Sequence, residues 1–387
     1  MNHEERGHAK LSASSAHRWL QCTRCIEVES QFPSETSIYA EEGTFMHELS
    51  EIYLRNYLKT ISKQQFSKEL KKYENNKYYS EETHDAVLAY VDEVVKKIDA
   101  AREISKDAVV IIEQKVDFSP WVEDGFGTSD VITITDGTLE VIDLKGGKGV
   151  EISANDNPQL KLYALGALNE FGFLYDIQNV KMSIVQPRVD NFSTFEMSVE
   201  DLLKWAEEEL KPKAKLAIKG EGEFCAGEHC RFCRARNQCR ARALKNLELM
   251  KYEFADSALL TDEEIAEIIG LSGELSKWAS DIYTYAAALA INDGKQWDGF
   301  KLVQGRSNRK YVDEEAVAEN AKAAGYSDIY KKRLITITEM EKLMGKKKFK
   351  DIIGSLVEKP KGKLTLVLES DKRKAVETVN TEFQVEE

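Results

Sequence analysis

The stretch "GTSDVITITDGTLEVIDLKGG" (residues 127–147) predicts two β-strands joined by a two-residue turn. Asp136-Gly137, between alternating β-forming residues, is among the strongest short-range signals for a hairpin. If these two residues form the loop, Thr135 pairs with Thr138, and this pairing sets the register of both strands. The stretch therefore predicts two paired antiparallel strands in a fixed register.

In that register Asp130 lies directly opposite Asp143. Cross-strand partners have Cβ atoms roughly 5 Å apart, and like charges placed there destabilise a sheet. The same face carries four apolar residues and one amine, which are Ile132, Ile134, Leu139, Val141 and Lys145. A hard divalent cation, Mg²⁺ or Mn²⁺, would relieve the repulsion. The alternative is a solvated hairpin end in which Lys145 is an ordinary salt-bridge partner, and the pairing alone leaves both open.

The composition predicts a soluble globular protein. The chain has 387 residues, 42% of them hydrophobic, and a formal net charge of −13, which argues against a generally basic nucleic-acid binder. Residues 331–374 are locally basic, with 14 Lys or Arg against 6 Asp or Glu. The N-terminal "MNHEERGHAK" has no apolar core, and the apolar run at 283–291 is too short to span a bilayer. We expect a cytoplasmic protein with no membrane partner.

Six cysteines form a second signal, because four of them fall within residues 225–239. "CRFCRARNQC" supplies Cys230, Cys233 and Cys239 with the spacing C-x2-C-x5-C. In a chain with no export signal this pattern indicates metal or redox chemistry rather than disulfides. A local site would add Cys225 and could hold tetrahedral zinc or an iron–sulfur cluster. A long-range site would instead recruit one of the two N-terminal cysteines, Cys22 or Cys25.

A helix is predicted after the hairpin in "NDNPQLKLYALGAL" (residues 155–168), with Asn157 as N-cap and Pro158 at the first helical position. Gln159 and Tyr163 are four residues apart and share one face of that helix. Upstream, "EEGTFMHELSEIYLRNYL" (residues 41–58) predicts another amphipathic helix, which carries His47. A lone histidine on a helix is more often a surface or packing residue than a ligand.

Taken in order, these features resemble the RecB-like branch of the PD-(D/E)xK nuclease superfamily, in particular its iron–sulfur members such as the AddB nuclease domain and the CRISPR-associated RecB-like exonucleases. They also resemble an uncharacterised phage-associated family of RecB-like nucleases. The series runs from an N-terminal cysteine through His47, Glu113 in a strand, Asp130, the "DLK" of residues 143–145, Gln159-x3-Tyr163 and the cysteine group. The resemblance spans about residues 10–245, and a weaker likeness continues through "KPKGKLTLVLESDKR" (residues 359–373).

The resemblance implies a role for each matching residue. Asp130, Asp143, His47 and the Leu144 carbonyl would hold Mg²⁺ or Mn²⁺, and Lys145 would act on the attacking water and the transition state. Gln159 and Tyr163 would face the substrate backbone. A structural 4Fe-4S cluster, with zinc less favoured, would be held by Cys22, Cys230, Cys233 and Cys239. Cys25 and Cys225 are extra, so which cysteine completes the set stays open.

The implied function is a metal-dependent deoxyribonuclease, with exonuclease action expected, that hydrolyses phosphodiester bonds. It would act in phage or prophage DNA replication, recombination or processing, in the cytoplasm of a bacterial host cell. Linear single-stranded DNA is the favoured partner. Phage replication or recombination proteins are further expected partners. The alternative is a catalytically silent DNA-end-binding scaffold stapled by iron–sulfur or zinc. Nucleotide binding by "KGGKG" (residues 145–149) is set aside, because the stretch lacks the spacing and the Ser or Thr of a Walker A loop.

The expected fold class is α+β, with a restriction-endonuclease-like core in which helices flank a mixed sheet. Residues 10–245 would form the nuclease domain with a helical cysteine region, and residues 255–387 a small α+β accessory domain. Within the latter, a long helix is predicted after a capping box of Thr261 and Glu264, ending near Gly294. A basic face with Arg306, Arg309 and Lys310 as candidates could guide DNA.

Overall fold

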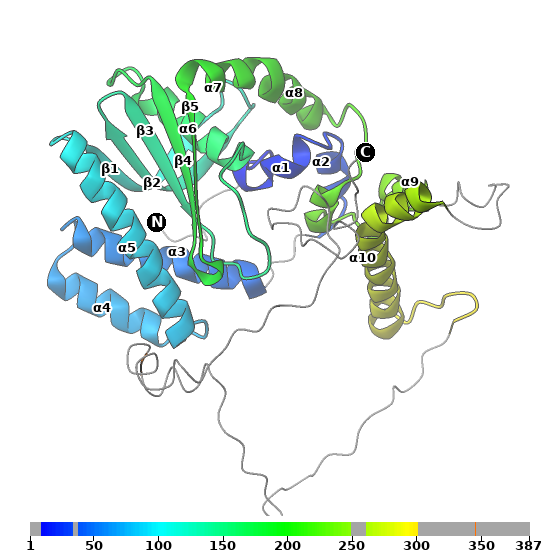
Figure 1. Ribbon diagram of the computed structural model, residues 1–387. Helices are drawn as coiled ribbons and strands as arrows, with labels where there is room; N and C mark the ends of the chain where they lie inside the picture. The colour runs from blue at the N-terminus through cyan, green and yellow to red at the C-terminus, as the bar shows by residue number, and fades with distance from the viewer. Residues whose placement is uncertain (1–8, 34–37, 249–260, 301–344, 346–387) are drawn as a thin grey trace, which may run out of the picture. The chain divides into compact units, whose positions relative to one another are not determined.

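The computed structural model describes residues 9–33, 38–248, 261–300 and 345. These residues confirm the predicted α+β class, because a five-stranded mixed sheet is flanked by helices (Figure 1). The strands are β1 (Val109–Asp117), β2 (Phe126–Thr135), β3 (Thr138–Leu144), β4 (Asn179–Gln186) and β5 (Asn191–Ser198). The α-helices are α1 (Ala16–Trp19), α2 (Cys25–Glu29), α3 (Ile38–Tyr57), α4 (Lys63–Glu74), α5 (Glu81–Ile104), α6 (Pro158–Phe171), α7 (Val199–Trp205), α8 (Lys211–Lys219), α9 (Arg240–Leu247) and α10 (Asp262–Asn292). Short 3-10 helices cover η2 (Ala13–Ser15), η3 (Pro187–Val189) and η5 (Glu228–Phe232), and a π-helical turn, η4, covers Ala206–Leu210.

The predicted hairpin lies in the middle of the sheet. Strands β2 and β3 pair antiparallel with Thr135 opposite Thr138, so the predicted register is confirmed. Gly137 has a φ of +76°, which the tight turn requires and glycine adopts without strain. The strand order is β1-β2-β3-β4-β5, and only β3 and β4 are parallel to each other, because α6 forms the crossover between them.

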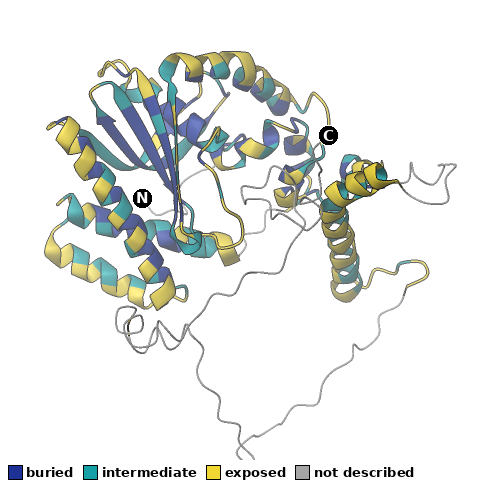
Figure 2. Ribbon diagram, in the orientation of Figure 1, coloured by how far each residue is buried: buried dark blue, intermediate teal, exposed yellow. Residues whose placement is uncertain are grey.

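Each face of the sheet packs against different helices. Helix α6 covers one face, where Ile132, Ile134, Leu139 and Val141 are buried as the alternation predicted. Helices α3 and α5 cover the other face, in an apolar cluster that contains Val131, Ile142 and Leu144. Burial is concentrated in the strands and on the helix faces turned toward them (Figure 2). Both faces of the hairpin are therefore covered by helices. The polar residues Asp130 and Asp143 lie at the end of the hairpin that is opposite its turn.

Two predicted helix starts are confirmed by their caps. The Asn157 side chain accepts hydrogen bonds from the backbone N–H groups of Gln159 and Leu160, at 3.0 and 3.4 Å, where α6 begins. At the start of α10, Thr261 and Glu264 form the reciprocal bonds of the predicted capping box, at 2.8 and 3.3 Å. Both caps satisfy backbone donors that the first helical turn leaves unpaired.

The chain divides into two compact units, Met1–Ala288 and Leu289–Glu387. This division lies further along the chain than the predicted boundary between residues 245 and 255, so most of α10 belongs to the first unit. In that unit, the buried Arg242 side chain of α9 bonds Glu274 and Asp281 of α10, at 2.8 and 2.7 Å.

Several predictions about the second unit lie outside the described residues. Arg306, Arg309 and Lys310, the candidates for a basic face, are among them. Within the described part of the chain, none of the helices combines the length and the apolar character needed to cross a bilayer.

Candidate metal centre

Three side chains that could hold a metal ion meet at one end of the sheet. His47 of α3, Glu113 of β1 and Asp130 of β2 each offer one ligand atom, and these atoms lie within 4.8 Å of one another. The Nδ1 atom of His47 is 3.1 Å from Oδ1 of Asp130. Carboxylate oxygens with one imidazole nitrogen form a donor set that suits Mg²⁺ or Mn²⁺. A possible metal-binding triad is thus present, built from three separate elements.

Asp130 lies where the β2–β3 ladder stops. The last paired residues are Val131 and Ile142, so Asp130 and Asp143 occupy the next position along the two strands. Oδ2 of Asp130 accepts the backbone N–H of Leu144 at 2.7 Å. The carboxylate thus satisfies a backbone donor at the strand end while its other oxygen faces His47.

Glu113 has an unusual backbone conformation for a residue inside a strand. Its φ is +52°, in the left-handed region that costs a non-glycine residue about 1–3 kcal/mol. Along β1, Ile111 packs toward α6 and Ile112 toward α5, but Val116 packs toward α6 again. The two-residue alternation therefore shifts by one position around Glu113. Strain of this kind collects at functional sites, where surrounding structure holds it in place.

Asp143 is held by residues of the predicted DxK and QxxxY motifs. Lys145 Nζ lies 2.9 Å from Oδ2 of Asp143 and donates to Oε1 of Gln159 at 2.8 Å. Nε2 of Gln159 lies 3.1 Å both from Oδ1 of Asp143 and from the Tyr163 hydroxyl. Gln159 therefore connects the hairpin to α6, and the four residues form one hydrogen-bonded group.

Tyr163 is buried, with 7% of its surface exposed, and its hydroxyl meets Gln159. A side chain at Gly127 would place its Cβ only 2.8 Å from Cε1 of Tyr163, so glycine at that position allows the ring to pack against β2. Burial and the charge of Asp143 raise the pKa of the Tyr163 phenol well above its usual range. The hydroxyl therefore stays protonated. Contact of Gln159 and Tyr163 with a substrate backbone stays a prediction.

The charged groups at the centre shift one another's pKa values. Burial lowers the pKa of His47, but the charge of Asp130 and the hydrogen bond between them raise it to about 9. Burial raises the pKa of Asp130, yet the His47 charge leaves it below its usual value. Burial raises the pKa of Asp143, against the opposing charge of Lys145. At neutral pH the metal-free centre therefore holds a protonated His47, and a metal ion would displace that proton.

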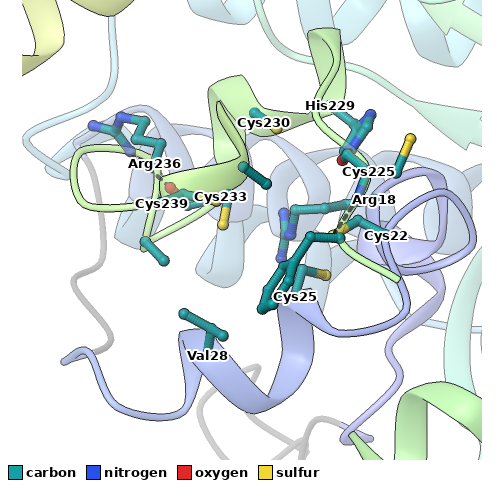
Figure 3. Close-up of a pocket in the computed structure, with 13 residues that line it drawn as sticks. Arg18, Cys22, Cys25, Val28, Cys225, His229, Cys230, Cys233, Arg236 and Cys239 are labelled. Atoms are coloured by element: carbon teal, nitrogen blue, oxygen red, sulfur yellow. Dashed lines mark hydrogen bonds between the residues drawn. The ribbon is translucent and has the colours of Figure 1, made fainter. Parts of the chain in front are cut away.

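All six cysteines line one pocket, although residue 22 and residue 239 are far apart in the chain (Figure 3). Cys22 and Cys25 come from the segment containing α1 and α2. Cys230 lies in η5, Cys233 directly follows it, and Cys239 precedes α9. The pocket therefore brings together both ends of the sequence pattern.

The N-terminal thiols are buried and the Cys225 thiol is exposed. Cys22 Sγ accepts the Cys225 backbone N–H at 3.5 Å. A hydrogen bond from the Cys25 thiol is the main cause that lowers the pKa of Cys22, to about 4, and it raises the pKa of Cys25. In Figure 3 the Cys225 sulfur points away from the sulfurs of Cys230 and Cys233. A buried thiolate is what a soft metal or an iron–sulfur cluster requires, so the donor chemistry fits such a group.

A buried ion pair joins the N-terminal helices to the cysteine loop. Glu29 is 2% exposed and accepts two bonds from Arg18, at 3.0 and 3.2 Å. Its other oxygen accepts the backbone N–H of Arg234 at 2.8 Å, and Arg18 also donates to the carbonyl of Phe232. The two segments are thus attached without any bound metal or cluster.

Sequence reasoning missed two site residues. Glu113 belongs to the motif series but not to the predicted metal ligands, and an acidic residue inside a predicted strand was the only available signal. His229 is 3% exposed in the cysteine pocket, beside the thiols of Cys22 and Cys230, with Nε2 at 2.8 Å from the Cys225 carbonyl oxygen. Its position directly before Cys230 was the only signal. The Leu144 carbonyl stays a predicted ligand.

Comparison with known proteins gives two findings. A model of the family described as "Protein of unknown function (DUF2800)" matches residues 8–374, which is most of the chain. Among solved structures, the chain is similar to one titled "Crystal structure of SSO0001", with 16% identity, covering 58% of this chain and 96% of that chain. The TM-score is 0.22, and a value this low does not show a shared fold.

Proposed function

We propose that this chain, which belongs to the DUF2800 family, is a metal-dependent DNA nuclease that hydrolyses phosphodiester bonds. One observation carries the proposal. The ligand atoms of His47, Glu113 and Asp130 lie within 4.8 Å of one another, beside the hydrogen-bonded group of Asp143, Lys145 and Gln159. A divalent-metal site next to a held lysine is an arrangement that suits attack on phosphate.

His47, Glu113 and Asp130 would hold Mg²⁺ or Mn²⁺, with Asp143 adjacent and the Leu144 carbonyl as a further predicted ligand. When bound, the metal would polarise the phosphate and lower the pKa of a water molecule. This assignment adds Glu113 to the predicted set. It differs from a metal shared by Asp130 and Asp143 alone, because Asp143 is engaged by Lys145 and Gln159.

Lys145 would stabilise negative charge that develops on the phosphate oxygens. Its side chain is 20% exposed, and its ammonium contacts both Asp143 and Gln159. A cation that is already oriented before the reaction does not have to reorganise when charge develops, and this is the main source of electrostatic catalysis. Gln159 and Tyr163 then act on Lys145 through the hydrogen bonds that hold it.

The cysteine pocket would hold a 4Fe-4S cluster through Cys22, Cys230, Cys233 and Cys239, with zinc as the less favoured occupant. The buried, low-pKa thiol of Cys22 supports it over Cys225 as the ligand from outside the C-x2-C-x5-C group. Cys25 is also buried beside Cys22, so both stay candidates. The cluster would be structural, because it would join residue 22 to residues 230–239.

The proposed substrate is linear DNA, single-stranded DNA above all, in phage or prophage replication, recombination or processing. The test offers full-length protein, purified without oxygen, to end-labelled linear single-stranded, linear duplex and circular DNA with Mg²⁺ or Mn²⁺. We expect the linear substrates to be degraded and EDTA to stop the reaction. DNA ends that are bound but never cut would instead identify a catalytically silent end-binding scaffold.

The decisive variant is Asp143→Asn, with Asp136→Asn as its matched control. Both remove one charge from the same hairpin, but Asp136 is an exposed turn residue and Asn-Gly is an equally favoured turn. We expect Asp143→Asn to lower cleavage by several orders of magnitude while DNA affinity survives. Because burial raises the pKa of Asp143, the ionised carboxylate opposes folding at neutral pH, and metal-free Asp143→Asn should be at least as stable as wild type. Cleavage that survives in Asp143→Asn would refute the proposal.

A further inference from the structure

Tyr90 of α5 carries a buried hydroxyl that the described residues leave without a hydrogen bond. The residue is fully buried, with 0% of its surface exposed. Its hydroxyl oxygen has no hydrogen-bond partner among the described residues. Buried polar groups are almost always hydrogen-bonded, because an unpaired one loses its bonds to water without replacement. An orphaned hydroxyl in an otherwise well-packed core therefore needs an explanation.

Tyr90 lies on the α5 side of the sheet, near the strand ends that carry the candidate metal centre. It belongs to the apolar cluster between α3, α5 and the sheet. That cluster includes the sequence neighbours of every acidic or imidazole group at the centre, namely Met46 before His47, Ile112 before Glu113, Val131 after Asp130, and Ile142 and Leu144 on either side of Asp143. Two contacts of α5 fix its position along β3. Near its start, Thr83 bonds Arg188, which also bonds the Gly146 carbonyl, and further along Lys97 bonds Glu140. Tyr90 is midway between Thr83 and Lys97, so it lies level with the end of β3 that carries Asp143.

The charges around Tyr90 keep its hydroxyl a donor. Burial, and then the carboxylates of Asp130, Glu113 and Asp143, raise the pKa of the Tyr90 phenol well above its usual value. These three carboxylates are close enough to act on the ring, but none of their oxygens forms a hydrogen bond with it. A group held by these carboxylates would therefore be a suitable acceptor for the hydroxyl.

We propose that the Tyr90 hydroxyl donates a hydrogen bond to a water molecule on the bound metal and so positions that water. The proposal rests on the metal centre of the proposed function, and it adds a residue that no motif includes. A water on the metal would supply this acceptor, because Glu113 and Asp130, which would hold the metal, are among the carboxylates that act on Tyr90. Tyr90 is thus a positioning residue, since it acts through the water rather than on the metal.

The test compares Tyr90→Phe with Tyr53→Phe in the full-length protein. Tyr53 of α3 packs against the same cluster, but its hydroxyl bonds Nε2 of His84 at 2.7 Å. Both variants remove one hydroxyl and keep the ring. Two quantities are measured for each variant, which are thermal unfolding without metal and the affinity for Mn²⁺ alone, followed by electron paramagnetic resonance.

We expect Tyr90→Phe to unfold at the same or a higher temperature than wild type, because no hydrogen bond is lost, and to bind Mn²⁺ about 10–100-fold more weakly. Tyr53→Phe should do the reverse, with a lower unfolding temperature and unchanged Mn²⁺ affinity. Equal Mn²⁺ affinity in wild type and Tyr90→Phe would overturn this inference and leave the nuclease proposal intact. A wild type that binds no Mn²⁺ would refute the metal centre itself, and with it the proposed function.

Discussion

His47 makes the metal-free protein sensitive to pH. Its pKa in the folded protein is about 9, above the usual value near 6.5, because the adjacent Asp130 carboxylate favours the charged imidazole despite burial. A pKa raised by folding contributes stability that is complete below the unfolded-state pKa and disappears as the pH rises through the folded-state pKa. The His47–Asp130 pair should therefore stabilise the protein at pH 6 and no longer do so at pH 10.

We predict that His47→Gln lowers the free energy of unfolding more at pH 6 than at pH 10. Urea unfolding of metal-free wild type and variant at the two pH values measures the difference. Mn²⁺ must displace the proton on His47, so wild-type Mn²⁺ affinity should rise between pH 6 and pH 9, by at most about tenfold per pH unit. A stability difference that is equal at both pH values would show that the ion pair contributes nothing.

Strand β1 contains one residue with a strained backbone, Glu113, at the metal centre. Glu113 holds a φ of +52° at the point where the side-chain alternation of β1 shifts. Glycine adopts positive φ without steric cost but loses about 0.5–1 kcal/mol inside a strand through backbone entropy. Because the strain costs about 1–3 kcal/mol, its relief should exceed the entropic loss at this position.

We predict that Glu113→Gly stabilises the metal-free protein by about 0.5–2 kcal/mol, whereas Glu113→Gln, which keeps a side chain of the same shape, does not. Both variants should lose Mn²⁺ affinity, because both remove a carboxylate. Urea unfolding and Mn²⁺ titration of the two variants separate these effects. If Glu113→Gly proved less stable than Glu113→Gln, the left-handed conformation would not be a source of strain.

The cysteine pocket joins the start of the first unit to residues 225–239 of the same unit. A link between residue 22 and residues 230–239 would close a loop containing the entire sheet, and closing long loops restricts the unfolded chain most. Arg18 and Glu29 already connect the same segments. Loss of the bound group should therefore loosen the connection without unfolding the sheet.

We predict that protein purified without oxygen is brown and contains iron and acid-labile sulfide. Cys22→Ala and Cys230→Ala should each bleach it, and Cys225→Ala, which removes an exposed thiol, is the matched control that should keep the colour. Absorbance together with iron and sulfide analysis measures the outcome. Bleaching by Cys225→Ala with a coloured Cys22→Ala would establish the local ligand set, and stoichiometric zinc without iron would rule out the cluster.

The turns, helix caps and strand faces of this protein could be predicted from the sequence, because they depend on residues close together in the chain. The hairpin register follows from Asp136-Gly137, and the start of α6 follows from Asn157 and Pro158. The same holds for the capping box of α10, because turns and caps are local hydrogen-bonding choices of a few residues. Strand alternation also assigned Ile132 and Leu139 to one face of the hairpin, because side chains two residues apart in a strand point the same way.

The members of the metal centre and of the cysteine pocket could be identified only from the tertiary structure, because they are far apart in the chain. Glu113 joins His47 and Asp130 because β1 pairs with β2 and changes its alternation through one left-handed residue, which no periodicity in the sequence indicates. His229 is buried among the cysteines, and Cys225, four residues earlier, is exposed. Tyr90 lies level with the strand end that carries Asp143 because α5 packs against the sheet. These outcomes depend on contacts between elements that are far apart in the chain, and local sequence patterns do not encode such contacts.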